Sequence, residues 1–411
     1  MTTAVSRPRL RAGVTLGPGL RCGPRTVHRV TDRLTGCTYR IGDREHFVLR
    51  LMDGEHTMDD IGHAYAETFG KVLGPDSRQQ IFTMLGRYQL LDGYTDETVL
   101  ERLRAAREER DARRTGPGTW YSRRWVLTRP DRLCGRLAGA LGVVFRPPAV
   151  ALCLLIALAG QVYVWTHLAA LTAATGHRPP WPVAVPLFLV LAWSLTALHE
   201  LAHGVACRYF GGRVSEIGVR WRLPLLIPYC RTDDVMLFPG RAARVGTAYA
   251  GCHAVLVLVA PLALVWTLLP HSGAPSAVLA AVVLFGSGGS LVALLPFLGL
   301  DGQAMLEHAL DRTELGRQTW RFWAARARRA GGDGYRRGDV TVHTAYGAAA
   351  CVAFAAGYAL LMRLWYGTLR QWTGSTGAIV ILAAETAIAL VVVVFLARHR
   401  TSTTRKAPDG R

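Results

Sequence analysis

The sequence predicts a polytopic α-helical membrane protein of about six transmembrane helices, preceded by a small N-terminal cytoplasmic α+β domain. Two observations predict the membrane class. Half of the 411 residues are hydrophobic and the mean hydropathy is +0.20, which is too apolar for an ordinary soluble protein of this length. The apolar residues are also gathered into long uninterrupted runs, as in spanning helices. No signal peptide is expected, because the first run long enough to span begins near Pro148.

The N-terminal part divides by composition. Residues 1–37 are rich in Arg, Gly and Pro, and we expect them to be irregular. Residues 38–95 carry short apolar patterns and then two helical ones. Thr57 with Asp60 three positions later reads as a helix N-cap, and apolar residues recur at helical spacing over 76–91. A segment of about 60 residues can bury only a minimal core.

Residues 96–147 are expected to join this domain to the membrane. Their first part is a highly charged helix with a thin apolar stripe, which we interpret as a solvated linker. Their second part, from Trp120 to Arg146, mixes Trp, Leu and Arg, and we expect it to lie at the level of the lipid headgroups.

The remainder of the chain is dominated by apolar runs that are each long enough to cross about 30 Å of hydrocarbon. A membrane core over 148–310 holds four of them, a basic cytoplasmic loop over 311–343 follows, and a basic tail over 398–411 ends the chain. The six runs are 148–170, 183–206, 245–269, 277–298, 344–366 and 377–397.

The arginines predict which way these runs cross the membrane. With the N-terminus inside, the outer connections carry only Arg178 and Arg370, and the inner ones hold the arginine clusters. This is the positive-inside pattern, with both termini cytoplasmic in a multi-pass plasma-membrane protein. The net charge of +19 is then explained by topology and contact with the bilayer, so no nucleic-acid partner is expected. The eight cysteines include no CxxC pair, which argues against a thiolate metal site or a disulfide framework.

A metal-binding motif lies at the end of the second apolar run, in Leu198-His199-Glu200-Leu201-Ala202-His203. His199 and His203 are four residues apart, so they share one face of a helix. In the HExxH arrangement two imidazoles bind Zn²⁺ and the glutamate acts on its water. Ionisable groups at the end of a membrane-spanning run are costly, which favours a functional role.

A zinc hydrolase needs a third protein ligand and an open position for water. Asp301 follows the fourth run, which crosses in the same direction as the second, so it should reach the same depth as the two histidines. Pro296 and Gly299 should break the helix just before it. His253 and His308 are weaker alternatives, since an intramembrane histidine more often hydrogen-bonds between helices and His308 lies well beyond the run.

Two further intramembrane features have structural interpretations. Glu385 in the last run is expected to hydrogen-bond between helices rather than to relay protons. The small residues over 286–290 are expected to allow close helix packing.

The two linked motifs, His199-Glu-Leu-Ala-His203-Gly and Leu-Pro-Phe-Leu-Gly-Leu-Asp301-Gly, resemble those of the site-2-protease family of intramembrane zinc metalloproteases. The likeness covers about residues 120–310 and is closest to the bacterial branch described as peptide zinc metalloproteases. It implies that His199, His203 and Asp301 bind Zn²⁺ and that Glu200 is the general base of a metalloendopeptidase. The chain departs from the family at Cys252-His253, where many members have Pro, and at Gln303, where an aromatic is common.

Residues 38–95 resemble the PqqD-like leader-recognition domains, through Tyr39-Arg-Ile, the turn and helix start over 51–61, and the terminal Leu-Leu-Asp-Gly93. Those domains are winged-helix modules, so the resemblance implies a winged-helix-like fold for this α+β domain. In that family a leader peptide adds as a strand to a sheet edge. Together the two resemblances imply a protease that removes the leader from a ribosomal peptide precursor, with maturation enzymes or an exporter as further partners.

Two alternatives remain open. The first is regulated proteolysis of a membrane-anchored regulator such as an anti-sigma factor, although residues 205–300 leave no room for the PDZ-like domain usual in such proteases. The second is a non-proteolytic metal-binding or export accessory, which an intact Glu200 disfavours because zinc binding alone does not require it.

Overall fold

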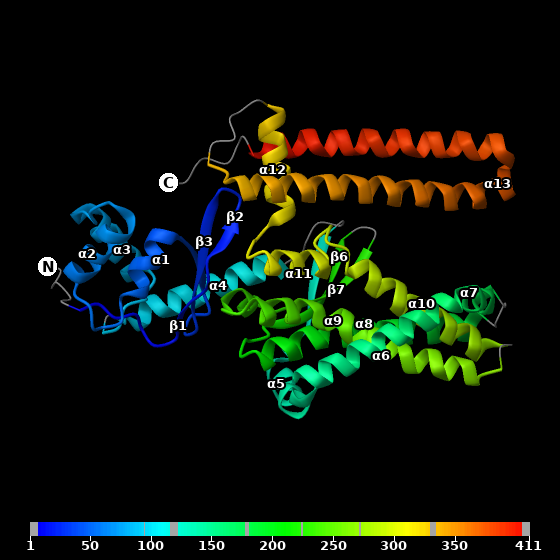
Figure 1. Cartoon of the computed structure of the whole chain (residues 1–411), viewed down its shortest axis with the longest axis horizontal. Helices are drawn as coiled ribbons and strands as arrows, with labels where there is room; N and C mark the ends of the chain where they lie inside the picture. The colour runs from blue at the N-terminus through cyan, green and yellow to red at the C-terminus, as the bar shows by residue number, and fades with distance from the viewer. Residues whose placement is uncertain are drawn as a thin grey trace. The chain divides into compact units, whose positions relative to one another are not determined.

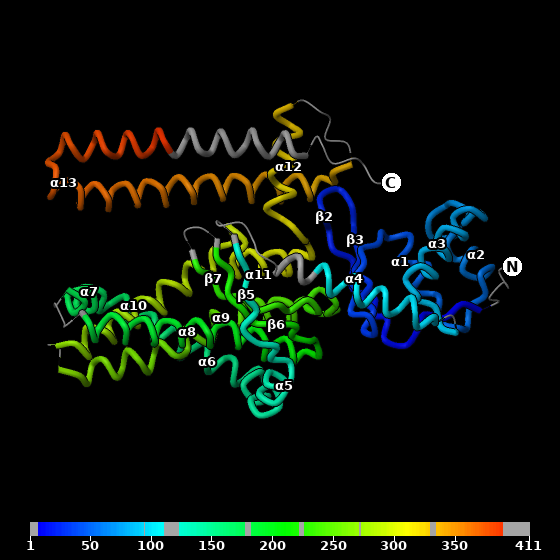
Figure 2. The backbone as a smooth tube through the Cα atoms, turned by 180° about the vertical axis from the view of Figure 1, so that it is seen from behind, coloured from blue at the N-terminus to red at the C-terminus, as the bar shows by residue number. Residues whose placement is uncertain are grey.

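The computed structural model describes residues 7–93, 95–115, 122–176, 181–222, 225–270, 273–328 and 334–404 (Figures 1 and 2). It is mostly helical, with two small antiparallel sheets. The chain divides into two compact units, Met1–Asp339 and Val340–Arg411, and each is described by itself.

The first unit begins with a small α+β module over 7–93, here called the N-terminal module. Its central strand is β3, with β1 and β2 end to end along one edge and β4 along the other. Three helices complete the module, and buried Val30, Val48, Leu49, Ile61 and Leu85 belong to its core. The elements are β1 Val14–Leu16, β2 Leu20–Cys22, β3 Arg25–Asp32, β4 Thr38–Gly42, α1 Asp43–Arg50, α2 Met58–Phe69 and α3 Pro75–Arg87.

The expectation that residues 1–37 are irregular is wrong, because three of the four strands lie there. In β3 the buried His28 and Val30 alternate with the half-buried Arg29, so one face of an arginine-rich segment still packs on the core. The composition concealed this alternation. The capping box at Thr57 is confirmed, since Thr57 and Asp60 exchange both hydrogen bonds at 2.8 and 3.1 Å.

The predicted charged helix is α4, Glu97–Thr115. In the segment after it, residues 122–128 form strand β5, and the expected position of this segment at the lipid headgroups stays a prediction. β5 pairs with β6, which pairs with β7, in an antiparallel three-stranded sheet. Strand pairing with a distant segment leaves no local signal in β5. The new elements are β5 Ser122–Thr128, α5 Asp131–Ala140, the 3₁₀ turn η1 Gly142–Phe145, β6 Glu216–Arg222 and β7 Leu225–Arg231.

Within the described residues, five helices are long and apolar enough to cross a membrane, judged by length and composition. Four belong to the first unit, where Val164, Val259, Trp266 and Val283 form a shared core with the short helix α7, Leu168–Gly176. The five are α6 Pro147–Thr166, α8 Trp181–Tyr209, α9 Arg241–Leu268, α10 Ala274–Ala293 and α13 Arg337–Thr404.

The last two predicted runs, 344–366 and 377–397, both lie in α13, which turns back on itself as a hairpin (Figure 1). The reversal is at Gly374, whose φ of 69° favours glycine. Trp365 donates its indole N–H to Glu385 across the hairpin at 3.0 Å, which is the interhelical bond predicted for Glu385.

The expected basic loop over 311–343 also holds regular structure. It contains α12, Leu315–Ala327, and the start of α13. Leu315, Thr319 and Phe322 are buried at helical spacing, a stripe that the surrounding arginines obscured. Of the predicted basic tail, residues 398–404 continue α13. Residues 405–411 and Arg178 lie outside the described residues.

Candidate metal centre

The HExxH motif lies near the end of α8, where His199 and His203 face the neighbouring helix α9. Gly251 of α9 stands directly opposite them. A Cβ atom at this position would overlap with the Nε2 atoms of both histidines. A glycine within a helix costs stability, so its presence here marks the close approach of α9 to the two imidazoles.

Asp301 reaches the site because the chain folds back sharply after α10. As predicted, the helix breaks before Asp301, since Leu298 and Gly299 have positive φ angles of 64° and 76°. Asp301 then begins α11, Asp301–Ala309. At the next residue, Gly302, a Cβ atom would overlap with the backbone carbonyl of Leu294, so glycine permits this return.

Three potential ligand atoms converge. Asp301 Oδ2 lies 2.9 Å from His199 Nε2 and 3.4 Å from His203 Nε2, and the two Nε2 atoms are 3.2 Å apart. Ligands about 2.0–2.1 Å from a tetrahedral zinc ion lie about 3.3 Å from one another. The three separations therefore fit three corners of a zinc tetrahedron, with the fourth corner left for water or substrate.

The protonation pattern also suits a metal. His203 Nδ1 lies 2.8 Å from the carbonyl oxygen of Thr247 on α9, to which it can donate its proton. That bond leaves the Nε2 lone pair directed at the site, as in the outer-shell partners of zinc-binding histidines. Asp301 offers a carboxylate oxygen as the third donor, and zinc accepts such an oxygen beside two imidazoles.

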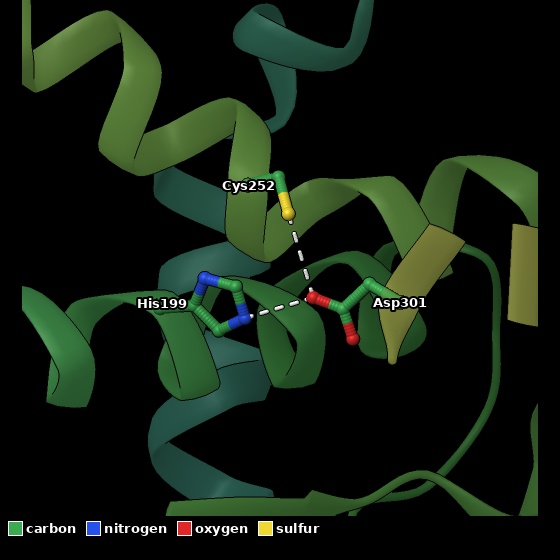
Figure 3. A group of neighbouring side chains, drawn as sticks. All are labelled: His199, Cys252 and Asp301. Atoms are coloured by element: carbon green, nitrogen blue, oxygen red, sulfur yellow. Dashed lines mark hydrogen bonds and ion pairs between the residues drawn. The ribbon is translucent and has the colours of Figure 1, made fainter. Parts of the chain in front are cut away.

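Cys252 also lies next to the candidate ligands, although the sequence motifs did not indicate it as a ligand. It is fully buried on α9, and its Sγ lies 3.5 Å from Asp301 Oδ2 (Figure 3). His199, Cys252 and Asp301 offer ligand atoms that all lie within 4.8 Å of one another. His203 belongs beside this group, because its Nε2 lies 3.4 Å from Asp301 Oδ2. Gly251 could have indicated Cys252 from the sequence, because a glycine within a helix can mark a close contact between helices and Cys252 is the next residue.

A cavity of about 650 Å³ opens beside these residues. Glu200 lines it together with His199, His203 and Asp301, and residues Ile227 to Cys230 of β7 form part of its wall. Among the described residues β7 pairs only with β6, so its second edge has no strand partner. The cavity therefore brings a carboxylate and an extended backbone next to the candidate metal ligands.

The two weaker candidates, His253 and His308, do not join the group of ligand atoms. The ring of His253 packs against Tyr249, with centroids 5.3 Å apart, and neither lines the cavity. His308 is buried in α11 rather than in a loop, and it lines the cavity without joining the ligand cluster. At Gly286 on α10 a Cβ atom would lie 3.0 Å from Val259, which agrees with the predicted close packing.

Comparisons of this chain with models of protein families, with curated proteins and with solved structures found no match.

Proposed function

We propose that this protein is an intramembrane zinc-dependent endopeptidase that removes the leader from a ribosomally made peptide precursor. The observation that carries the proposal is the convergence of His199, His203 and Asp301 at tetrahedral spacing, with Glu200 in the same cavity. Zinc binding alone needs no glutamate there, whereas peptide hydrolysis needs a base. In the predicted topology, both termini and the metal centre lie at the cytoplasmic side of the plasma membrane.

His199, His203 and Asp301 would hold the metal. When bound, zinc supplies Lewis acidity and makes a nucleophilic water available at neutral pH. Glu200 accepts a proton from the attacking water and returns it to the amine nitrogen that leaves the scissile bond. The edge of β7 along the cavity wall supports binding of the substrate as an extended strand, the conformation that exposes a peptide bond to attack.

The N-terminal module supports the choice of substrate. Among the described residues, β4 pairs only with β3, so its second edge is available to an added strand. A leader held there would keep the rest of the precursor near the membrane.

The test is peptide cleavage in cells. The protein is co-expressed with the small peptide genes encoded beside it, and peptide masses are compared between wild type and Glu200→Gln. Glu385→Gln is the matched control, because it makes the same chemical change at a residue engaged in the α13 hairpin.

We expect the leader to be lost in wild type and control but retained in Glu200→Gln. Unchanged masses for all neighbouring peptides in wild type would contradict leader removal and direct the search to membrane-anchored regulators. Equal cleavage in wild type and Glu200→Gln would contradict a glutamate-dependent protease at this site.

A further inference from the structure

A second cavity, here called the arginine cavity, lies between the N-terminal module and the β5–β6–β7 sheet. Its volume is about 570 Å³, and seven arginines and three aspartates line it, so the charged wall is strongly cationic. The arginines come from β3, the β3–β4 turn, β4, α4, the approach to β6, and β7: Arg29, Arg33, Arg40, Arg107, Arg110, Arg213 and Arg231.

The three aspartates are already engaged with other groups. Asp131 accepts the backbone N–H of Val214 at 2.9 Å, and Asp234 accepts that of Arg213 at 3.1 Å. Asp233 is paired with Arg231 at 2.5 Å. These carboxylates also attract Arg29, Arg33 and Arg213, but three aspartates facing seven arginines leave the cavity wall with an excess of positive charge.

Three guanidinium groups make no hydrogen bond or ion pair with any residue in the described ranges: those of Arg29, Arg33 and Arg213. Arg29 is half-buried, and burial lowers its pKa despite the attraction of Asp233. The attraction of Asp233 does not outweigh the cost of burying this cation, so a bound anion would stabilise this wall.

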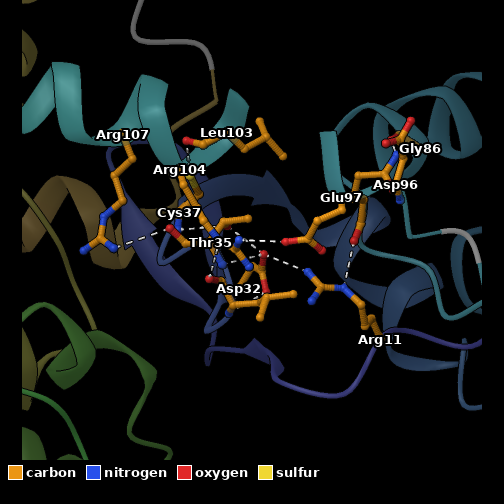
Figure 4. Close-up of polar contacts among 12 residues, drawn as sticks. Arg11, Asp32, Thr35, Cys37, Gly86, Asp96, Glu97, Leu103, Arg104 and Arg107 are labelled. Carbon is orange, nitrogen blue, oxygen red and sulfur yellow. Dashed lines mark hydrogen bonds and ion pairs between the residues drawn. The ribbon is translucent and has the colours of Figure 1, made fainter. Parts of the chain in front are cut away.

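The cationic wall is built by the fold rather than by loose side chains. Helix α4 is tied to the β3–β4 turn by hydrogen bonds from Arg104 to the Leu34 carbonyl and from Arg107 to the Thr35 carbonyl, both 3.4 Å (Figure 4). The turn itself is held by Asp32, which is fully buried. Gly36 has a φ of 66°, and a Cβ atom there would overlap with the Arg107 guanidinium. The turn thus leaves room for Arg107 at the cavity.

The arginine cavity adjoins the 650 Å³ cavity at the candidate metal centre, here called the metal cavity, through β7. Ile227 to Cys230 line the metal cavity, and the next residue, Arg231, lines the arginine cavity. Thr232 then faces the first cavity and Asp233 the second. From Ile227 to Arg231 an extended chain covers about 13 Å, at about 3.3 Å per residue. A peptide lying along β7 would therefore reach both cavities within a few residues.

We propose that the arginine cavity is a subsite for acidic side chains of the peptide substrate, placed a few residues from the bond that is cleaved. The proposal rests on the proposed protease function for the role of the peptide, but binding of an acidic peptide does not depend on cleavage. Guanidinium forks match carboxylates in geometry and charge, which is how arginine clusters recognise acidic motifs.

The position in the fold of the residues that line the arginine cavity favours a peptide over an anionic lipid as its ligand. Most of its residues belong to the N-terminal module and the highly charged helix α4, rather than to the apolar helices. The continuity with β7 also points to an extended backbone rather than to a headgroup.

The experiment measures binding without catalysis. Full-length protein carrying Glu200→Gln is placed in nanodiscs of zwitterionic lipid, and a fluorescein-labelled hexaglutamate peptide is titrated by anisotropy, with hexaglutamine as the neutral probe. The test variant adds Arg29→Gln, Arg33→Gln and Arg213→Gln. The matched control adds Arg44→Gln, Arg102→Gln and Arg136→Gln, which remove the same charge from exposed positions outside the cavity.

We expect hexaglutamate to bind more tightly than hexaglutamine and to weaken with added salt. The triple cavity variant should bind hexaglutamate about tenfold more weakly, and the control should stay within about twofold of the Glu200→Gln parent. Equal weakening in both variants, or equal binding of the two probes, would overturn the subsite.

Binding to lipid vesicles distinguishes an anionic lipid from an acidic peptide as the ligand of the arginine cavity. If the triple cavity variant loses affinity for phosphatidylglycerol vesicles but not for hexaglutamate, the arginines bind membrane and the proposal is wrong. Failure of the proposed function looks different, because wild type would then cleave no peptide while the anisotropy result stood.

Discussion

Substituting Gly251 by alanine tests the geometry of the metal centre most directly. The new methyl carbon would occupy the space beside His199 Nε2 and His203 Nε2, where the proposed zinc ion would bind. Either the imidazoles rotate or α9 moves away from α8. Overpacking of this kind costs about 1–3 kcal/mol. Displaced ligands or outer-shell partners lower metal affinity about 10- to 100-fold.

The assay is zinc affinity of the purified protein by competition with a fluorescent chelator, alongside thermal unfolding in excess chelator. Gly246→Ala is the control on the same helix, because its Cβ would make an ordinary 3.5 Å contact with Phe210. The control should bind zinc normally and be stabilised by up to about 1 kcal/mol through helix propensity. Zinc affinity of Gly251→Ala within about twofold of wild type would refute the reasoning.

Three further predictions concern stability. Burial, together with the neighbouring His28, lowers the pKa of His46 from its usual value near 6.5 to about 4. The unfolded chain therefore binds more protons between pH 6.5 and 4, so stability falls as pH decreases through this window, and His46→Gln should flatten that dependence in urea unfolding at pH 7 and 5. Thr57→Ala removes the capping box and should cost about 1 kcal/mol, seen as faster amide hydrogen exchange in α2 while α3 is unchanged. Arg244→Met removes a buried guanidinium that pairs with Asp311 and donates to the Phe238 carbonyl, while Arg241 still pairs with Asp311, so it should cost about 1–3 kcal/mol and lower the thermal midpoint more than Arg44→Met on the exposed face of α1.

The predictions that depend on local sequence patterns agree with the structure. Apolar runs predicted the helices that hold the centre, because a helix forms from residues close in sequence and its length follows from the run. The spacing of His199 and His203 fixed their common face for the same reason. The break at Leu298 and Gly299 was likewise expected from the proline and glycine there.

Strands β3, β5 and β7 were not predicted from the sequence. β3 and β5 carry many arginines, and their partners lie in other segments, so neither composition nor a local period marked them. β7 was missed in the same way, although it forms a wall of both cavities.

Local patterns in the chain predicted the pair of histidines, the adjacent Glu200 and the apolar helices that carry them, because all of these depend on neighbours along the chain. Asp301 was expected near the histidines because its apolar run should end at their depth, and the structure brings its Oδ2 to 2.9 Å from His199 Nε2. That Cys252 joins this group and that an arginine-lined cavity adjoins it is seen only in the folded chain. Such meetings depend on how closely α9 approaches α8 at Gly251 and how the chain returns at Gly302, which are packing distances between segments far apart in sequence.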